Sequence, residues 1–263
     1  MGQQLAGKSA VVTGSTSGIG RAIATLFAAE GANVMLNGFG DAAEIEAYRS
    51  GLEGAHKAKV RFHGADMMKP DQIVDLVRAA EREFGAVDIL VNNAGIQHVA
   101  PVDEFPADRW DAIIAINLSS VFHATKAALP GMKRRKWGRV INIASAHGLV
   151  ASPNKSAYVA AKHGVIGFTK TAALENAELG VRVNAICPGF VLTPLVQKQI
   201  EDLARQHGIS TERSTKEMIL GPQPTKEFVK VEEIAAMALY LSSAAAAQIN
   251  GASFSIDGGW TAR

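Results

Sequence analysis

Short apolar runs alternate along this chain with longer segments in which apolar residues recur every three or four positions. Seven short runs predict buried strands, at residues 9–13, 33–37, 60–64, 89–92, 139–144, 181–187 and 253–256. The segments between them predict helices that begin near Ile19, Asp41, Pro70, Pro106, Ser156 and Lys230, and the helix from Pro106 is expected to bend or break near Asn117. Such alternation predicts one α/β domain over residues 1–263, a doubly wound parallel sheet of about seven strands with helices on both faces.

One segment, residues 191–229, interrupts this alternation. It is longer than an ordinary connection, contains a helical pattern at 195–207 and ends in Gly221-Pro-Gln-Pro224. A connection of this length at the ligand-binding edge of a parallel sheet predicts a helical lid over the substrate. The alternative is an insertion that only decorates the surface.

A glycine-rich turn follows the first strand, in Ala10-Val-Val-Thr-Gly-Ser-Thr-Ser-Gly-Ile-Gly20. Gly14 permits the tight turn, Gly18 lets a pyrophosphate approach the main chain, and Gly20 allows the helix to pack closely on the strand. Strand, turn and helix form the first half of a βαβ unit, so the pattern predicts a Rossmann-type dinucleotide site, although its glycine spacing differs from G-x-G-x-x-G. The alternative is a purely structural turn.

Tyr158 and Lys162 are four residues apart in a predicted helix, and Ser145 precedes them at the end of a predicted strand. Residues at i and i+4 share one helix face, so the ammonium of Lys162 is expected to lie beside the phenol and to lower its pKa from about 10. A phenol tuned in this way is suited to general acid–base catalysis. Alone the pair is weak, because a surface lysine beside a half-buried tyrosine is common in helices.

Composition and charge favour a soluble enzyme of the cytoplasm. The net charge is +2, so the chain offers no general attraction for nucleic acid or anionic membrane, and we interpret Lys133-Arg-Arg-Lys136 as a solvated helix end. No apolar stretch is expected to be long enough to span a bilayer. The single cysteine, Cys187, excludes an intrachain disulfide, and no cluster of side chains suggests a metal site.

In their order along the chain, these motifs resemble those of the short-chain dehydrogenase/reductase family. The shared residues are Thr13-Gly-Ser-Thr-Ser-Gly-Ile-Gly20, Asn92-Asn-Ala-Gly95, Asn117, Ser145, Tyr158, Lys162, Pro188-Gly189, Gly251 and Asp257-Gly-Gly259. The resemblance implies a catalytic set in which Tyr158 transfers the hydroxyl proton, Lys162 lowers its pKa and holds the nicotinamide ribose, and Ser145 binds the substrate oxygen. Asn117 would hold a water that links Lys162 to solvent. The alternatives are that Ser145 caps a strand end and that Asn117 satisfies backbone groups at the helix bend. The resemblance also implies a homotetramer joined by the helices near Pro106 and Ser156 and by C-terminal segments.

The same resemblance implies a bound nicotinamide dinucleotide. Its expected contacts are Gly14, Thr16, Ser17, Gly18, Ile19, Gly20, Phe39, Asp66, Met67, Asn93, Ala94, Gly95, Tyr158, Lys162, Pro188, Gly189, Val191 and Thr193. The second strand ends in Asn37-Gly-Phe-Gly-Asp41, which lacks both the acidic residue of many NAD enzymes and a cation for a 2′-phosphate. Phe39 would crowd such a phosphate, so we expect NAD. Asp66 could alternatively be a plain helix cap.

Polar residues beyond the catalytic set indicate the substrate. Gln97, His147, Lys155 and Gln199 fall where substrate binds in this family, and a cation with an imidazole and two amides suits a small carboxylate. With Gly38-Phe39-Gly40 and Trp260, they resemble the branch of the family that acts on short 3-hydroxy acids, which implies reversible oxidation of D-3-hydroxybutyrate to acetoacetate. Trp260 would pack by the methyl end, or it is a buried structural residue.

Three other functions stay open. A 3-oxoacyl-(acyl-carrier-protein) reductase shares the catalytic set, but would favour NADP, an open channel and a basic docking surface. A sugar or polyol dehydrogenase would use the amides and the histidine for hydroxyl groups. A dinucleotide-sensing protein without turnover is the most remote, because this chain keeps Tyr158 and Lys162.

Overall fold

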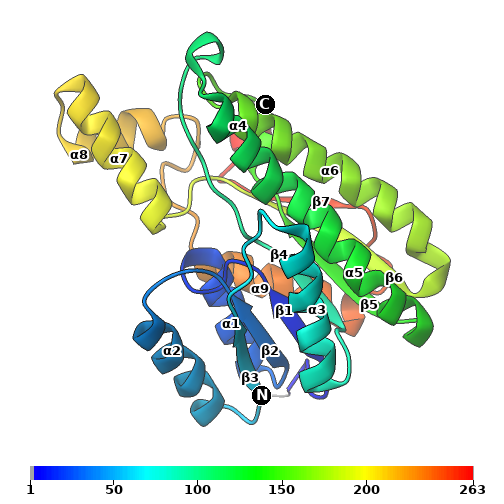
Figure 1. Ribbon diagram of the computed structural model, residues 1–263. Helices are drawn as coiled ribbons and strands as arrows, with labels where there is room; N and C mark the ends of the chain where they lie inside the picture. The colour runs from blue at the N-terminus through cyan, green and yellow to red at the C-terminus, as the bar shows by residue number, and fades with distance from the viewer. Residues whose placement is uncertain (1–2, 263) are drawn as a thin grey trace.

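The computed structural model describes residues 3–262, in which seven strands form one parallel sheet (Figure 1). The strands are β1 (Ser9–Val12), β2 (Asn33–Asn37), β3 (Val60–His63), β4 (Ile89–Asn92), β5 (Gly138–Ile143), β6 (Val181–Pro188) and β7 (Ser253–Ile256). Their order across the sheet is β3-β2-β1-β4-β5-β6-β7. The predicted strands are confirmed, and no end differs from its expected position by more than one residue.

The helices follow the predicted alternation. They are α1 (Gly18–Ala29), α2 (Ala42–Ala55), α3 (Pro70–Phe84), α4 (Ala107–Ile114), α5 (Ser120–Arg135), α6 (Ser156–Asn176), α7 (Pro194–His207), α8 (Thr211–Arg213) and α9 (Val231–Ser242). Capping residues determine where several of these helices begin or end. The Asp41 carboxylate accepts hydrogen bonds from Ala43 N and Glu44 N at the start of α2, and Gly85 ends α3 in the left-handed conformation at φ 82°.

Apolar side chains fill both faces of the sheet. On one face, Phe27 of α1, Leu52 of α2 and Leu239 of α9 join strand residues such as Val34 in one cluster. On the other face, helices α3, α5 and α6 supply Leu76, Ala128 and Ala172 to a second cluster. The central strands β1, β4 and β5 are therefore buried along their whole length, which explains why their sequences are apolar almost throughout rather than alternating.

The strand order reverses between β1 and β4. The chain passes from β3 at one edge back to β4, which pairs with β1 in parallel register, Val11 opposite Leu90. Connections leave in opposite directions at this switch point, so a crevice opens outside the carboxyl ends of β1 and β4. The glycine-rich turn after β1 and the Asn92-Asn-Ala-Gly95 segment after β4 lie at its edges.

The long helix that starts after Pro106 is interrupted as predicted. A π-helical segment, η2 (Ala115–Ser119), contains Asn117 and separates α4 from α5. By length and composition, Ala107–Arg135 could cross a membrane, with a mean hydropathy of 1.3, so the expectation that no stretch is long enough was wrong. The helix packs against α3 and α6, and one such helix is only weak evidence for a membrane span.

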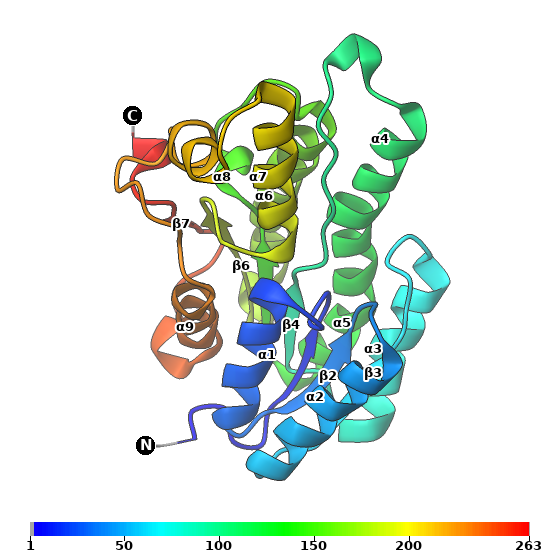
Figure 2. The same ribbon diagram turned by 90° about the vertical axis from the view of Figure 1, so that its left-hand side faces the viewer.

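The segment at residues 191–229 is helical, as predicted. It contains α7, α8 and a second π-helical segment, η5 (Ser214–Ile219), and a β-bridge between Val191 and Val229 joins its two ends. Figures 1 and 2 show α7 and α8 standing away from the sheet, beyond the end of β6. The segment therefore leaves and rejoins the body of the protein at one place, and its role as a lid stays a prediction.

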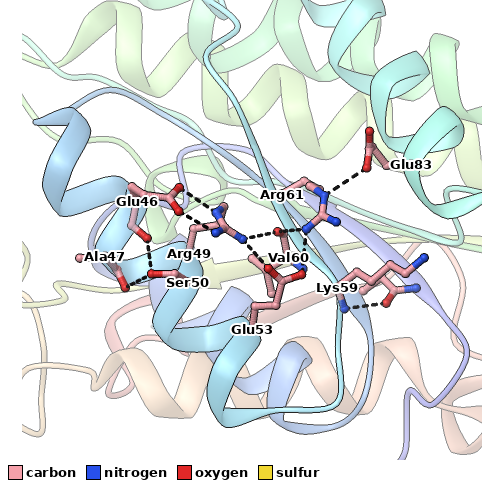
Figure 3. A network of polar contacts seen from close by, with 10 residues as sticks. Glu46, Ala47, Arg49, Ser50, Glu53, Lys59, Val60, Arg61 and Glu83 are labelled. Atoms are coloured by element: carbon pink, nitrogen blue, oxygen red, sulfur yellow. Dashed lines mark hydrogen bonds and ion pairs between the residues drawn. The ribbon is translucent and has the colours of Figure 1, made fainter.

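A network of ion pairs ties α2 to β3 and α3 at the surface (Figure 3). Arg49 pairs with Glu46 and with Glu53, both at 2.6 Å, and Arg61 pairs with Glu53 at 2.8 Å and with Glu83 at 3.1 Å. Hydrogen bonds from Arg49 and then Arg61 lower the pKa of Glu53 from 4.5 to about 2. Glu53 therefore connects the two arginines.

Replacing Glu53 with glutamine should lower the melting temperature at neutral pH by about 2 °C, because an exposed network contributes about 1 kcal/mol or less. Since folding lowers the pKa of Glu53, its contribution is present above pH 4.5 and is lost as the pH falls toward 2. Thermal melts at several pH values test this, with Glu175→Gln as the control for an exposed glutamate on α6. A melting difference that stays constant down to pH 2 would contradict the role of Glu53.

Candidate active site

A cavity of about 400 Å³ lies at the carboxyl ends of the central strands. Its lining comes from the turn after β1, the segment after β4, the end of β5, the start of α6, the turn after β6, and the beginning of α7. One end is formed by Gly14, Phe39 and Asp66, and the other by Lys155 and Trp260. The lining therefore spans the carboxyl edge of the sheet, from residues that follow β1, β2 and β3 to residues that follow β5, β6 and β7.

The glycine turn at one end leaves room that side chains would fill. Gly14 and Gly18 have φ of 62° and 53°, and a Cβ on Gly18 would approach the Thr193 methyl to 3.3 Å. Asn93 Nδ2 donates to the carbonyls of Thr13 and Gly14 at 2.9 and 3.0 Å, which fixes the turn against β4. A Cβ on Gly20 would collide with the Gly14 carbonyl, so Gly20 serves the close packing that was expected of it and does not line the cavity.

The region after β2 holds no cation toward the cavity. Thr16 Oγ1 donates to the Phe39 carbonyl at 2.9 Å, and the Phe39 side chain is 70% exposed at the rim. Across from it, Asp66 Oδ1 accepts from Met68 N, whereas the N-cap of α3 is Lys69, so Asp66 is not the helix cap that was the alternative. Among the described lining residues, the lysines are Lys155 and Lys162, both at the opposite end.

Tyr158, Lys162 and Ser145 come together as predicted. Tyr158 and Lys162 are one turn apart in α6, with Lys162 Nζ 5.5 Å from the centre of the Tyr158 ring. Lys162 is buried, and its ammonium donates to the Ile143 carbonyl at 2.8 Å, which anchors α6 to the end of β5. Ser145 follows β5, accepts from His147 N at 3.1 Å, and lies beside the Tyr158 phenol.

The direction of the Tyr158 pKa differs from the expectation. Burial raises the pKa of the phenol, and the hydrogen bond from Ser145 only partly opposes this effect. Burial also lowers the pKa of Lys162 to about 8. The protein's own groups therefore do not give the net lowering of the pKa predicted from the Tyr–Lys spacing. Desolvation of the phenol is the largest effect, and the Lys162 ammonium donates to the Ile143 carbonyl.

Asn117 is buried next to the cavity without lining it. Its Oδ1 accepts from Ile96 N and its Nδ2 donates to Ile96 O, both at 2.9 Å. The side chain thus satisfies backbone groups at the helix break, which was the alternative to a water-binding role. That Asn117 holds a water stays a prediction.

A cluster of a cation and aromatic rings forms the other end of the cavity. Lys155, only 7% exposed, lies 5.2 Å above the ring of Phe190, and burial lowers its pKa to about 8. Phe190 stacks on Trp260 with centroids 5.2 Å apart, and the His147 ring meets Trp260 and Tyr158 edge-on at 4.9 and 5.9 Å. Burial lowers the pKa of His147 to about 3, so this imidazole is neutral near pH 7.

The cavity brings together nearly all of the predicted site residues, since only Gly20 and Asn117 are absent from its lining. Gln97 and Gln199 both reach it, and Gln97 Nε2 is buried without a hydrogen-bond partner among the described residues. The structure adds lining residues that the sequence analysis missed: Asn37, Gly38, Ala65, Ile96, Ile116, Ile143, Ala144, Phe190, Pro194 and Val196. Of these, Phe190 follows Pro188-Gly189 directly and could have been inferred from that position.

Known proteins resemble this chain in sequence and in structure. A family model described as short chain dehydrogenase matches residues 8–204. The chain is 58% identical to a D-beta-hydroxybutyrate dehydrogenase of Cupriavidus necator, over 98% of this chain and 100% of that protein. It is also 58% identical to a protein of the same name from Rhizobium meliloti, over 97% and 99% of the two chains. The crystal structure of levodione reductase superposes with a TM-score of 0.91 at 35% identity, covering 98% of this chain and 99% of that one.

Proposed function

Because the chain belongs to the short-chain dehydrogenase family, we propose that it catalyses the reversible oxidation of D-3-hydroxybutyrate to acetoacetate with NAD. As a member of that family it is an oxidoreductase with a nicotinamide dinucleotide as cofactor. The observation that carries the substrate assignment is the buried Lys155, which lines the same cavity as Tyr158 and Ser145. Such a cation needs an anion, and a short 3-hydroxy acid would supply one close to its hydroxyl.

The dinucleotide would lie along the crevice, with its pyrophosphate at the glycine turn. The space over Gly18 and the N-terminus of α1 fit a phosphate group, since main-chain N–H groups and the helix dipole favour negative charge there. NAD is favoured over NADP because a 2′-phosphate near Phe39 would find no cation at that end of the described lining and would meet Asp66.

When bound, NAD would take the hydride from the carbinol carbon of the substrate. Tyr158 would accept the hydroxyl proton in oxidation and return it in reduction. Ser145 would bind the same oxygen and stabilise its developing charge. Lys162 would orient the nicotinamide ribose, and the positive charge of the oxidised nicotinamide would help to lower the Tyr158 pKa, which burial raises.

The carboxylate would be held at the Lys155 end of the cavity. Lys155 is the N-cap residue of α6, so the helix dipole adds to its charge in attracting an anion. Gln97, Gln199 and the neutral His147 would give directed hydrogen bonds, and the unpartnered Nε2 of Gln97 is a donor for this purpose. Phe190 and Trp260 would pack against the methyl group.

The pKa of Lys155 predicts a pH dependence of carboxylate binding. With a pKa of about 8, Lys155 is charged below that pH and loses its charge above it. The inhibition constant of butyrate, which has the carboxylate and lacks the hydroxyl, should therefore rise about tenfold for each pH unit above 8.

Inhibition of the NAD-bound enzyme, measured from pH 6 to 10, tests this without depending on the proton transfer at Tyr158. Lys155→Arg serves as the comparison, because arginine stays charged over the whole range and should remove the dependence. A butyrate constant that does not change up to pH 10 in the unsubstituted enzyme would contradict the role of Lys155.

Rates with matched substrates discriminate the alternatives. The proposal predicts a higher kcat/KM for acetoacetate with NADH than for an acetoacetyl thioester with NADPH. The reverse order would favour a 3-oxoacyl-(acyl-carrier-protein) reductase. A polyol dehydrogenase is disfavoured because an uncharged substrate would leave Lys155 buried without a counter-charge, and high activity on polyols would overturn this argument.

We also propose a homotetramer. Phe122 on α5 is 45% exposed and Leu174 on α6 is 80% exposed, which suits the pairing of these helices between copies. Light scattering coupled to gel filtration should give the mass of four 27.7 kDa chains, and a monomer mass would reject the proposal.

A further inference from the structure

One buried glutamine lies behind the substrate end of the cavity and does not line it. Gln223 is 0% exposed and belongs to the segment that returns from the lid to the body of the protein. Its Oε1 accepts from Phe190 N at 2.5 Å, and its Nε2 donates to the Glu227 carbonyl at 2.6 Å. The amide oxygen therefore binds the turn after β6, and the amide nitrogen binds the returning segment itself.

Two glycines beside this amide leave the space that its side chain occupies. A Cβ on Gly189 would collide with Gln223 Oε1, and a Cβ on Gly258 would lie 3.3 Å from Nε2. Thr225 N donates to the Gly258 carbonyl at 3.2 Å, so the turn after β7 is bound to the same segment. Three stretches of chain that are distant in sequence thus meet around one side chain.

These contacts fix the wall of the substrate end. The main chain of Phe190 is held on both sides, by Gln223 at its N–H and by Val229, whose N–H donates to the Phe190 carbonyl at 2.9 Å. Trp260, on which the Phe190 ring stacks, follows the turn after β7, where Asp257 accepts from Gly259 N and Thr261 N, both at 3.0 Å. The two stacked rings are therefore attached to main-chain segments that buried and partly buried hydrogen bonds hold in place.

We propose that Gln223 is a positioning residue for substrate recognition, which holds Phe190 against Trp260 and beneath Lys155 and joins this wall to the base of the lid. The inference deepens the proposed function and rests on it, because the substrate end of the cavity is defined by that function. Gln223 contacts neither substrate nor cofactor, and it would act through the Phe190 main chain.

The positioning role requires that the side chain at position 223 carry both a hydrogen-bond donor and a hydrogen-bond acceptor. Gln223→Met keeps the length and removes both hydrogen bonds, leaving Phe190 N and Glu227 O without these partners. Gln223→Glu keeps both bonds only while its carboxyl is protonated, since a carboxylate would face the Glu227 carbonyl without a hydrogen. Burial favours the protonated form, so this variant should recover as the pH falls.

Steady-state kinetics with D-3-hydroxybutyrate tests the inference. Gln223→Met should raise the KM for the acid about tenfold or more, because the buried Phe190 N–H loses its hydrogen-bond acceptor. The Kd for NAD should stay unchanged. For Gln223→Glu, kcat/KM for the acid is divided by that of the unsubstituted enzyme at the same pH. This ratio should approach one at pH 6 and should fall as the pH rises. Gln197→Met is the control, because Gln197 is an exposed amide of α7 that bonds only the Glu201 side chain among the described contacts.

Amide hydrogen exchange keeps this test independent of the proposed function. If no 3-hydroxy acid is a substrate, the proposed function fails, yet the Phe190 N–H should still exchange faster in Gln223→Met than in the control. If Gln223→Met has an unchanged KM, or if Phe190 exchange is unaltered in a folded variant, the positioning role is rejected. An equal loss of substrate and NAD affinity would also reject it, as the sign of general destabilisation.

Discussion

Tyr158→Phe should lower kcat by about 10²–10⁴-fold, the usual contribution of one positioned acid–base group. Phenylalanine keeps the ring that meets His147 edge-on at 5.9 Å, so the shape of the cavity should change little. The substitution removes the hydroxyl beside Ser145, and the neighbouring His147 is a poor replacement as a base because burial lowers its pKa to about 3. Single-turnover measurement of NADH formation from D-3-hydroxybutyrate gives the chemical step directly.

The Kd for NAD should change little in this variant, because Tyr158 is one of many expected contacts and the glycine turn that would hold the pyrophosphate is at the other end of the cavity. Tyr240→Phe is the matched control, since Tyr240 is a 43% exposed residue of α9 outside the cavity lining. Turnover of Tyr158→Phe within a factor of a few of the parent enzyme would remove Tyr158 from the chemistry.

Lys155→Met should give the second largest effect, a loss in kcat/KM for D-3-hydroxybutyrate of about 30-fold to several thousand-fold. This range corresponds to the roughly 2–5 kcal/mol that is lost when one partner of a buried charge pair is truncated. Methionine keeps the apolar stem over Phe190 and removes the charge, so the effect should fall on the substrate and spare the Kd for NAD.

Lys170→Met controls for loss of a lysine from the same helix, because Lys170 is exposed and outside the cavity lining. Restored affinity for an uncharged analogue such as 3-hydroxybutanamide would support an electrostatic role. If Lys155→Met oxidises hydroxybutyrate as the parent does, the carboxylate anchor is another group.

The fold was predictable because its signals are local. Strands covered on both faces have apolar runs that need no partner to be recognised, and β4, Ile89–Asn92, is an example at the predicted bounds. The glycine turn was also predictable, because each of its three positions needs a glycine. Gly14 and Gly18 have positive φ, and Gly20 faces the Gly14 carbonyl. Even the break at Asn117 was foreseen, although not its π-helical form.

Features that depend on packing between distant segments were not predictable. The spacing of Tyr158 and Lys162 gave their proximity, but the rise in the Tyr158 pKa comes from burial that no spacing shows. The stack of Phe190 on Trp260 joins turns seventy residues apart in sequence, and Gln223 reaches Phe190 across thirty-three residues. Such contacts follow from the sheet order, which brings β6 beside β7.

The account depends on one cleft in which the phenol of Tyr158, a pyridine dinucleotide and a short anionic alcohol meet. Initial rates of NADH absorbance with NAD and each enantiomer of 3-hydroxybutyrate test this most directly. We expect a rate with the D enantiomer that saturates with its concentration, and little or none with the L enantiomer. No NADH from either enantiomer, in a preparation that binds NAD, would contradict the account.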